Sequence, residues 1–247
     1  MQLSADEIER YARQIMVKEI GGAGQQKLAA AKVSIIGAGA LGGPCALYLA
    51  AAGLGQIELI DDDRVQRSNL ARQIQFGEAD TGASKVDTLA RALLDLNPHI
   101  RIMNRRERFV SGTALSGDIL IDATDNFGTR FALNRLAHES GRRLVSGAAG
   151  IWAGQVGVFE SGLADDGPCY QCFVPETPPD AADCETVGVI GPVTGIVGSR
   201  MALETLKLIT GAGVALVSHL WIFDALGGRE RTVKVQKDMK CAVCGSS

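Results

Sequence analysis

Short apolar runs alternate with amphipathic segments over the first 150 residues of the chain. The runs that predict buried strands are 33–36, 57–60, 100–103, 118–121 and 144–147. The segments whose apolar positions have helical spacing are 41–52, 84–96 and 127–140. A further helix over 4–17 begins with a capping box, formed by Ser4 and Glu7. Because strands and helices alternate, the sequence predicts a parallel, doubly wound α/β sheet.

The pattern changes near residue 150. Residues 154–160 alternate in polarity and predict an exposed or antiparallel strand, whereas 161–186 predict a long irregular loop. A helix over 192–210 and closing strands over 220–224 and 231–235 follow. We therefore expect one domain over 1–247, with a Rossmann-like, mainly parallel sheet that antiparallel strands extend. Its parts are a helical arm (1–30), an α/β half (31–150) and an extension (151–247).

The charge pattern excludes several classes of protein. Residues 33–57 carry no charge and are numerous enough to span a membrane, but the glycines and Pro44 among them favour a buried strand, turn, helix and strand. The chain is 46% apolar with a net charge of −3, which argues against binding to nucleic acid or to a membrane surface. No signal peptide is visible, so we expect a cytoplasmic protein with reduced cysteines.

A glycine-rich turn follows the first predicted strand. Gly37, Gly39 and Gly42 form a G-x-G-x-x-G pattern that opens a helix. Such a turn lets the backbone approach a phosphate, and the N–H groups of the helix start then face the anion. Asp61 ends the second strand at the distance expected of an acid that binds a ribose hydroxyl. The pattern favours a nucleotide site in the half 31–150 over a tight turn without a ligand.

Polar and cationic residues cluster after the second strand. Asn69, Arg72 and Lys85 are placed where a phosphate tail would lie. An intact nucleoside triphosphate carries about four negative charges and needs such fixed cations, whereas a dinucleotide can be held by the helix end. Taken singly, each residue is better explained as a solvated loop side chain, which most surface Arg and Lys residues are.

Two acids end the strand at 118–121. Asp122 and Asp125 lie where open α/β sheets bind ligands, and Mg²⁺ on a phosphate takes one or two carboxylates. Both residues also precede the helix that starts at Phe127, so helix capping is the alternative. We expect Asp122 to cap the helix and Asp125 to hold the metal.

Four cysteines form two Cys-x-x-Cys pairs, Cys169 with Cys172 and Cys241 with Cys244. Two such pairs suit a closed, tetrahedral zinc site that clips the tail to a distant loop. A redox pair or an iron–sulfur cluster is the alternative, but neither pair follows a strand at a helix start as in thioredoxin-like proteins. Cys45 reads as a small core residue. Cys184 lies in a predicted polar loop. It is equally well explained as a reactive thiol and as an ordinary loop cysteine.

Together these motifs resemble the ThiF/MoeB/HesA group, the bacterial relatives of ubiquitin-activating enzymes. The resemblance covers nearly the full chain and rests on the glycine loop, the cysteine pairs and these residues: Arg10, Tyr11, Arg13, Gln14, Asp61, Ser68, Asn69, Arg72, Gln73, Lys85, Asp122, Thr124, Asp125 and Asn126. The segments 183–186 and 191–196 look closer to the ThiF branch than to MoeB. Two departures are Ala40, where relatives often have glycine, and Ala71, where glutamine is common.

The resemblance implies an enzyme that uses ATP and Mg²⁺ to adenylate the C-terminal Gly-Gly carboxylate of a small ubiquitin-like sulfur carrier protein. The product would lead to a thiocarboxylate for thiamine, molybdopterin or related cofactor synthesis. By this resemblance Arg72 and Lys85 hold the phosphates, Asn69 orients them, Asp125 carries Mg²⁺ and Asp61 takes the ribose. The full set of implied ATP-binding residues is Gly37, Gly39, Ala40, Gly42, Asp61, Ser68, Asn69, Arg72, Lys85, Asp125 and Asn126.

The resemblance also implies partners. Arg13 would reach the site of a second subunit, so a homodimer is expected. The extension 151–247 would bind the carrier and Zn²⁺, and Cys184 is placed where some ThiF-like members link to the carrier. Because no sulfurtransferase domain follows the second cysteine pair, we expect a separate sulfur donor.

Three other readings remain open at this point. An NAD-dependent oxidoreductase could use the same glycine loop, but it leaves Arg72, Lys85 and Asp125 unexplained. A non-catalytic zinc-bearing scaffold is the second. An ATP-dependent enzyme that modifies a tRNA base is the third, and the acidic net charge and the cysteine pairs argue against it.

Overall fold

The computed structural model describes residues 3–178 and 188–245. Eight strands form one mixed sheet in the order β3-β2-β1-β4-β5-β6-β7-β8. The strands are β1 (Lys32–Ile36), β2 (Gln56–Ile60), β3 (Arg101–Arg105), β4 (Ile119–Asp122), β5 (Arg143–Ala149), β6 (Ala153–Phe159), β7 (His219–Asp224) and β8 (Arg229–Lys234). The strands from β3 to β5 pair in parallel, and β6, β7 and β8 add antiparallel pairs. The predicted mainly parallel sheet with an antiparallel extension is confirmed.

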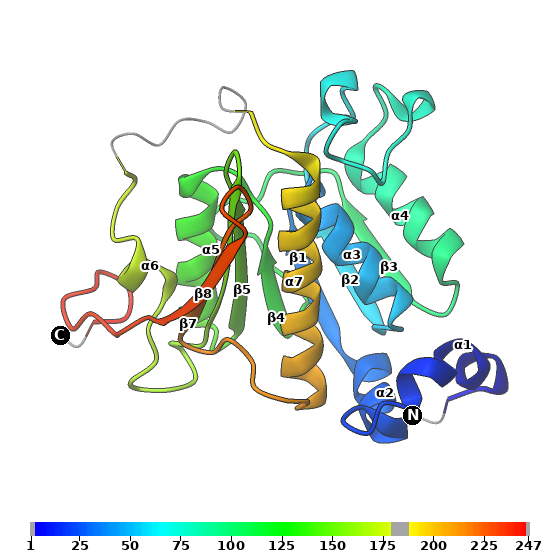
Figure 1. Ribbon diagram of the computed structural model, residues 1–247, viewed down its shortest axis with the longest axis horizontal. Coiled ribbons are helices and arrows are strands. Elements are labelled where there is room, and N and C mark those ends of the chain that lie inside the picture. Colours follow the sequence, from blue (N-terminus) through cyan, green and yellow to red (C-terminus); the bar gives the residue numbers. More distant parts are fainter. Residues whose placement is uncertain (1–2, 179–187, 246–247) are drawn as a thin grey trace.

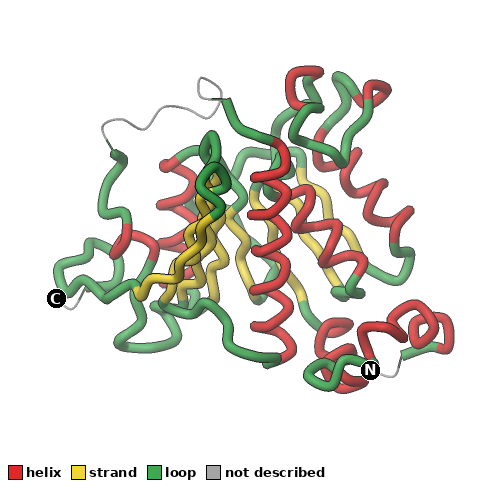
Figure 2. Tube along the Cα trace, viewed as in Figure 1, coloured by secondary structure: helices red, strands yellow, loops and turns green. Residues whose placement is uncertain are grey.

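Helices cover both faces of this sheet (Figure 1; Figure 2). The described helices are α1 (Ala5–Ile15), α2 (Gly21–Ala30), α3 (Gly42–Ala51), α4 (Lys85–Leu96), α5 (Phe127–Glu139), α6 (Tyr170–Phe173) and α7 (Gly191–Thr210). In Figure 1, α3, α4 and α7 lie in front of the sheet and α5 lies behind it. Each face has its own apolar core, because the central parallel strands β1, β2 and β4 are buried on both sides. None of the helices in the described ranges has the length and apolar character needed to cross a bilayer.

The uncharged segment 33–57 is buried in this framework. It forms β1, the glycine turn, α3 and the start of β2, as expected. Cys45 on α3 has no exposed surface, and burial strongly raises the pKa of its thiol, so its prediction as a core residue is confirmed. Gly198 of α7 approaches α3 so closely that a Cβ atom there would lie 2.5 Å from the Leu41 carbonyl oxygen.

The N-terminal helices contain one confirmed prediction and one omission. Ser4 and Glu7 form the expected capping box of α1. The helix α2 was not predicted, because its sequence, GGAGQQKLAA, lacks an apolar stripe. Tertiary contacts hold it instead: the buried Gln25 donates to the Ala52 carbonyl at 2.9 Å, and Lys27 donates to the Thr210 carbonyl at 3.0 Å.

A buried acid joins the parallel strands to the segment 106–117. The Glu58 carboxylate accepts hydrogen bonds from Ser34 Oγ, from Ser116 N–H at 2.8 Å and from Arg105 Nη1 at 2.9 Å. Burial raises the pKa of Glu58, but these hydrogen bonds lower it by more. The ionised carboxylate is therefore the form that the fold stabilises.

Candidate functional site

The glycine turn is built for a close approach of backbone to backbone and backbone to ligand. Gly37 has φ +95°, and a Cβ atom there would lie 2.6 Å from the Ala123 carbonyl oxygen. A Cβ atom at Gly42 would lie 1.8 Å from the Gly37 carbonyl oxygen. At Gly39 a Cβ atom would meet only the end of the Gln73 side chain, at 3.4 Å. The fold thus requires the first and third glycines, whereas the second leaves room for a ligand. Ala40 follows it and is partly exposed.

Asp61 is fixed against this turn from the end of β2. Its Oδ2 accepts a hydrogen bond from Ala38 N–H at 2.7 Å, and its Oδ1 accepts one from Asp63 N–H at 2.8 Å. Burial raises the pKa of Asp61, and the charge of Lys85 opposes this shift. Each carboxylate oxygen still has a lone pair for a hydroxyl donor. The position fits the expected role on a ribose.

The predicted cations lie along the same edge. Lys85 begins α4 and is 6% exposed, and its Nζ lies 2.6 Å from Asp63 Oδ2. Asn69 is buried at the end of a short 3₁₀ helix, Arg67–Asn69. Arg72 is half-buried and donates from Nη1 to the carbonyl of the exposed Ser68 at 3.1 Å. Lysine has three donors, so Lys85 can serve Asp63 and a phosphate together.

Asp122 is the last residue of β4, and its contacts differ from those expected. Asp122 does not cap α5, so that prediction was wrong. Asn126 is the N-cap, with its Oδ1 accepting from Thr129 N–H at 2.9 Å. Asp122 has no exposed surface and accepts from Thr124 Oγ1 and from Ser146 Oγ, both at 2.7 Å. A strand residue that lies four positions before the cap points into the sheet, out of reach of the first helical N–H groups.

Asp125 lies at the exposed tip of this turn. The turn lies beside the glycine loop, since Ala123 N–H donates to the Ile36 carbonyl at 2.9 Å and Gly37 packs on the Ala123 carbonyl. Among the ranges that the structure describes, the Asp125 carboxylate forms no ion pair. An exposed carboxylate beside the glycine turn is a group that can hold a cation.

Sequence reasoning missed Gln75, a glutamine that braces the glycine loop. Gln75 donates from Nε2 to the carbonyls of Ala38 and Gly39, both at 3.0 Å. Its amide lies so close to α3 that a Cβ atom at Gly43 would be 2.2 Å away. Within residues 3–178 and 188–245, the buried Oε1 atoms of Gln73 and Gln75 have no hydrogen-bond partner. Only the closeness of Gln75 to Arg72 and Gln73 in the sequence could have signalled this role.

Arg13 lies at the opposite edge of the sheet. It is exposed on α1, which packs against the far ends of α3 and α4: Tyr11 Oη accepts from Asn97 Nδ2, and Gln14 donates to the Ala52 carbonyl. Figure 1 shows α1 and α2 at one end of α7, and the strand ends that bear the glycine turn at the other. The structure therefore does not bring Arg13 to the other predicted residues of its own chain. Cys184 lies outside the described residues.

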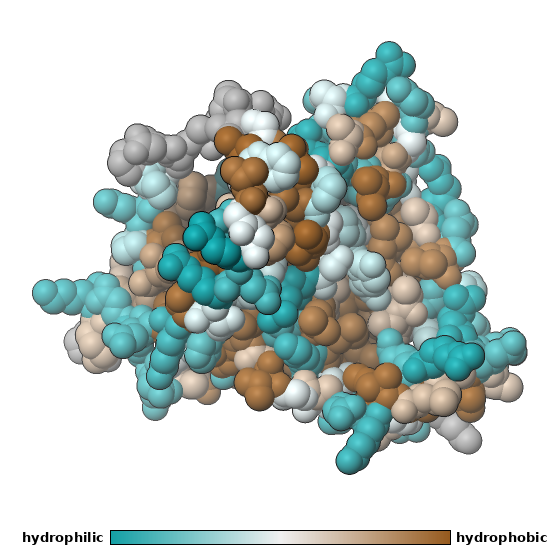
Figure 3. Space-filling model, in the orientation of Figure 1, coloured by the Kyte–Doolittle hydropathy of each residue, from teal (hydrophilic) through white to brown (hydrophobic). Residues whose placement is uncertain are grey.

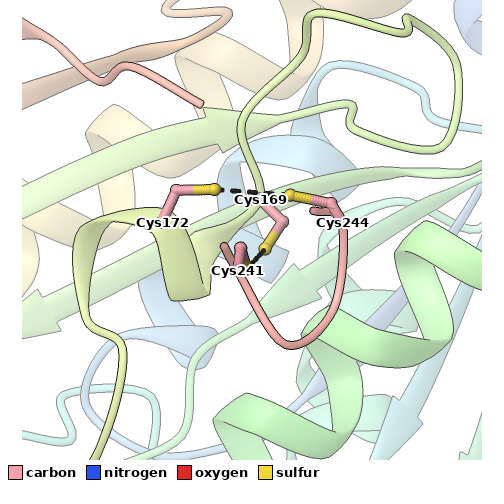
Figure 4. Close-up of side chains that lie close together, drawn as sticks. All are labelled: Cys169, Cys172, Cys241 and Cys244. Carbon is pink, nitrogen blue, oxygen red and sulfur yellow. Dashed lines mark hydrogen bonds between the residues drawn. The ribbon is translucent and has the colours of Figure 1, made fainter. Parts of the chain in front are cut away.

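The four cysteines converge, although Cys241 lies 69 positions after Cys172 in the sequence (Figure 4). All four Sγ atoms lie within 4.8 Å of one another, with Cys169 3.5 Å from Cys241 and Cys172 3.3 Å from Cys244. Tetrahedral zinc with bonds of about 2.3 Å places sulfurs about 3.8 Å apart. Four soft donors at this spacing fit Zn²⁺ and leave no position for a reacting water.

One neighbour of the cluster, Asn134, suits a thiolate at Cys169. Burial raises the pKa of the Cys169 thiol to about 11, and a hydrogen bond from Asn134 opposes this shift. Asn134 is 1% exposed, and its Nδ2 is a donor with no other acceptor among the described residues. A metal-bound thiolate at Cys169 would supply that acceptor.

A second group of possible metal ligands lies after β2. Asp61, Asp62 and Asp63 bring three carboxylates together, and those of Asp62 and Asp63 are exposed.

Comparison with known proteins agrees with this geometry. The chain is 39% identical to the sulfur carrier protein adenylyltransferase of Thermus thermophilus, over 99% of this chain and 93% of that protein. It is 38% identical to the SAMP-activating enzyme E1 of Haloferax volcanii, over 99% of this chain and 92% of that protein. It is 41% identical to the adenylyltransferase and sulfurtransferase MOCS3 of Dictyostelium discoideum, of which it spans 58%.

Solved structures match the fold. A crystal structure of E. coli MccB with ATP superposes with a TM-score of 0.83 at 22% identity, covering 96% of this chain and 75% of that one. At this identity the likeness establishes the α/β fold with its eight-stranded mixed sheet. The model of the ThiF family matches residues 11–243, so the chain belongs to the ThiF family.

Proposed function

We propose that this protein adenylates the C-terminal carboxylate of a small ubiquitin-like sulfur carrier protein, with ATP as the nucleotide donor. The observation that carries the proposal is the gathering of a glycine turn, Asp61, Lys85 and Asp125 at one edge of the sheet in a ThiF-family chain. Relatives of nearly the same length are named for the activation of such carriers.

The chemistry needs positioning more than acid–base groups. A carboxylate oxygen of the carrier forms a bond to the α-phosphorus of ATP, the bond from that phosphorus to the bridging oxygen breaks, and pyrophosphate leaves with the electron pair. The carboxylate is already ionised, so no general base is required. Arg72 and Lys85 would stabilise the charge that develops on the phosphate oxygens, and Asn69 would orient them. Ser68 and Asn126 would complete the nucleotide site.

Two metals fit the residues present. Asp125 would hold Mg²⁺, which neutralises charge on the departing phosphates when bound. Zn²⁺ would be held by Cys169, Cys172, Cys241 and Cys244 in a structural role. A reducing cytoplasm, where we place the protein, keeps these thiols available to a metal.

A homodimer would give Arg13 a role. The helix α7 is 20 residues long, about 30 Å, and runs from the nucleotide edge to α2 at the other edge. Arg13 lies at the α2 edge and is too far from its own nucleotide site for an arginine side chain to reach it. A role for Arg13 in adenylation would therefore require the site of a second copy. Residues of α7 and Trp221 line an open groove of about 520 Å³, and apolar residues are visible along α7 in Figure 3. A second copy that docked on this face would cover the groove.

The extension 151–247 would receive the carrier, with the Gly-Gly tail directed toward Asp125. A separate sulfur donor would then convert the acyl-adenylate to a thiocarboxylate for thiamine, molybdopterin or a related cofactor. Cys184, in the segment that separates α6 from α7, would take part in that later step and not in adenylation.

The test is ATP–pyrophosphate exchange with purified protein and a panel of sulfur carriers that end in Gly-Gly. We expect exchange that depends on one carrier, and a matched carrier without its last glycine serves as the control. A folded protein that binds NAD and shows no exchange with any carrier would contradict the proposal.

A further inference from the structure

One face of α5 contacts both the nucleotide edge and the cysteine cluster. Arg130 and Asn134 lie one helical turn apart on this face, and they are 5% and 1% exposed. Arg130 reaches the turn between β4 and α5, whereas Asn134 reaches the segment of Cys169. Two sites that are remote in sequence therefore share one rigid element.

Arg130 fixes the backbone from which Asp125 projects. Its Nη2 donates to the Thr124 carbonyl at 2.6 Å and to the Gly147 carbonyl at 3.1 Å. Its Nε lies 3.5 Å from Asp122 Oδ2, a carboxylate with no exposed surface. The guanidinium thus ties the residue before Asp125 to β4 and β5 together.

The other side of Arg130 meets the cysteine cluster. Its Cζ lies 5.5 Å from the centroid of the Tyr170 ring. Tyr170 lies between Cys169 and Cys172 in the sequence, is 2% exposed, and donates its N–H to Asn134 Oδ1 at 2.8 Å. Its ring also packs edge-on against Phe159 at 5.7 Å. The position of this ring follows from the position of the two cysteines that flank it.

We propose that Arg130 is a positioning residue through which α6 and the metal-bound cysteine cluster hold the β4–α5 turn in the conformation that binds Mg²⁺ and ATP. The inference rests on the proposed function, because that function assigns the turn to the nucleotide. Arginine is required here: its planar fork serves two carbonyl oxygens, a carboxylate and an aromatic face at once, which a lysine ammonium does not.

The first test measures the local stability of the β4–α5 turn. Amide hydrogen exchange at 123–126 is measured in the zinc-loaded protein and in Arg130→Lys and Tyr170→Leu. We expect exchange to be faster by about tenfold in both variants, because each loses the contact between the guanidinium and the Tyr170 side chain. Arg135→Lys, an exposed residue of the same helix, is the matched control. Unchanged exchange in both altered variants, with zinc retained, would overturn the proposal.

The second test measures whether the effect of zinc on nucleotide binding depends on Arg130. Removing zinc from the wild-type protein should weaken binding of Mg²⁺ and ATP by about tenfold, whereas removing it from Arg130→Lys should add no further loss. Equal losses in both proteins would show independent effects and overturn the proposal. Both readouts omit the carrier, and the first omits ATP, so failure of the proposed adenylation would appear separately, as absent pyrophosphate exchange in an intact protein.

Discussion

Loss of one ligand from the cysteine cluster should cost the protein much of its stability. A metal that joins Cys172 to Cys241 closes a loop of 69 residues. The chain entropy removed from the unfolded state by a cross-link of this length is worth about 4 kcal/mol. For a chain of this size, that corresponds to a fall of about 8–16 °C in Tm. We therefore expect Cys172→Ser to lose the metal and to melt earlier by this amount.

The metal should also compete with protons. Burial raises the pKa of the Cys169 thiol to about 11, so the metal-free cluster keeps this proton at neutral pH and releases it on binding. Metal affinity should therefore rise as the pH rises. Zinc content is measured by mass spectrometry and Tm by circular dichroism, with Cys45→Ala as a control that keeps the cluster intact. A Cys172→Ser protein with full zinc content, or with an unchanged Tm, would refute the reasoning.

Three further predictions concern the nucleotide edge and the fold. Gly42→Ala places a Cβ atom 1.8 Å from a loop carbonyl oxygen, so we expect weaker ATP binding by calorimetry and a loss of about 1–3 kcal/mol in urea unfolding; unaltered ATP affinity would contradict this. Arg72→Ala and Asp125→Ala should abolish pyrophosphate exchange without changing the circular dichroism spectrum, and near-normal exchange would remove that residue from the site. The lowered pKa of Glu58 gives stability that is present above the ordinary glutamate pKa and lost as the pH falls through the lowered value. Glu58→Gln should therefore flatten the acid limb of the stability profile, and an unchanged limb would argue against it.

The sequence predicted elements best where local pattern and tertiary packing agree. Each strand of the parallel half was predicted to within about two residues, and the buried ones are marked by short, mainly apolar runs. The helix α2 was missed because its stability comes from contacts of Gln25 and Lys27 with distant segments. Such contacts leave no periodicity in the local sequence.

The site shows the same division. Motif spacing located Gly37, Gly42 and the cysteine cluster, since each requires a residue type that few other positions need. It assigned the cap of α5 to Asp122 instead of Asn126, because a choice among neighbouring polar residues depends on backbone direction. It also missed Gln75, which belongs to none of the motifs. Its side-chain amide braces the loop by donating to two carbonyl oxygens.

The antiparallel extension has a kinetic consequence. In the parallel half, one crossover helix joins β1 to β2, β2 to β3 and β4 to β5. Two pairs of strands meet across longer segments: β1 with β4, and β6 with β7, where the segment contains α6 and α7. Loop-closure entropy opposes both pairings until their contacts form, so the pairing of β6 with β7, like that of β1 with β4, should form late in folding. The cysteine cluster joins segments on either side of that same closure. A bound metal would then act mainly on the rate of unfolding, and would hold the protein folded by slowing the separation of its last-formed strands.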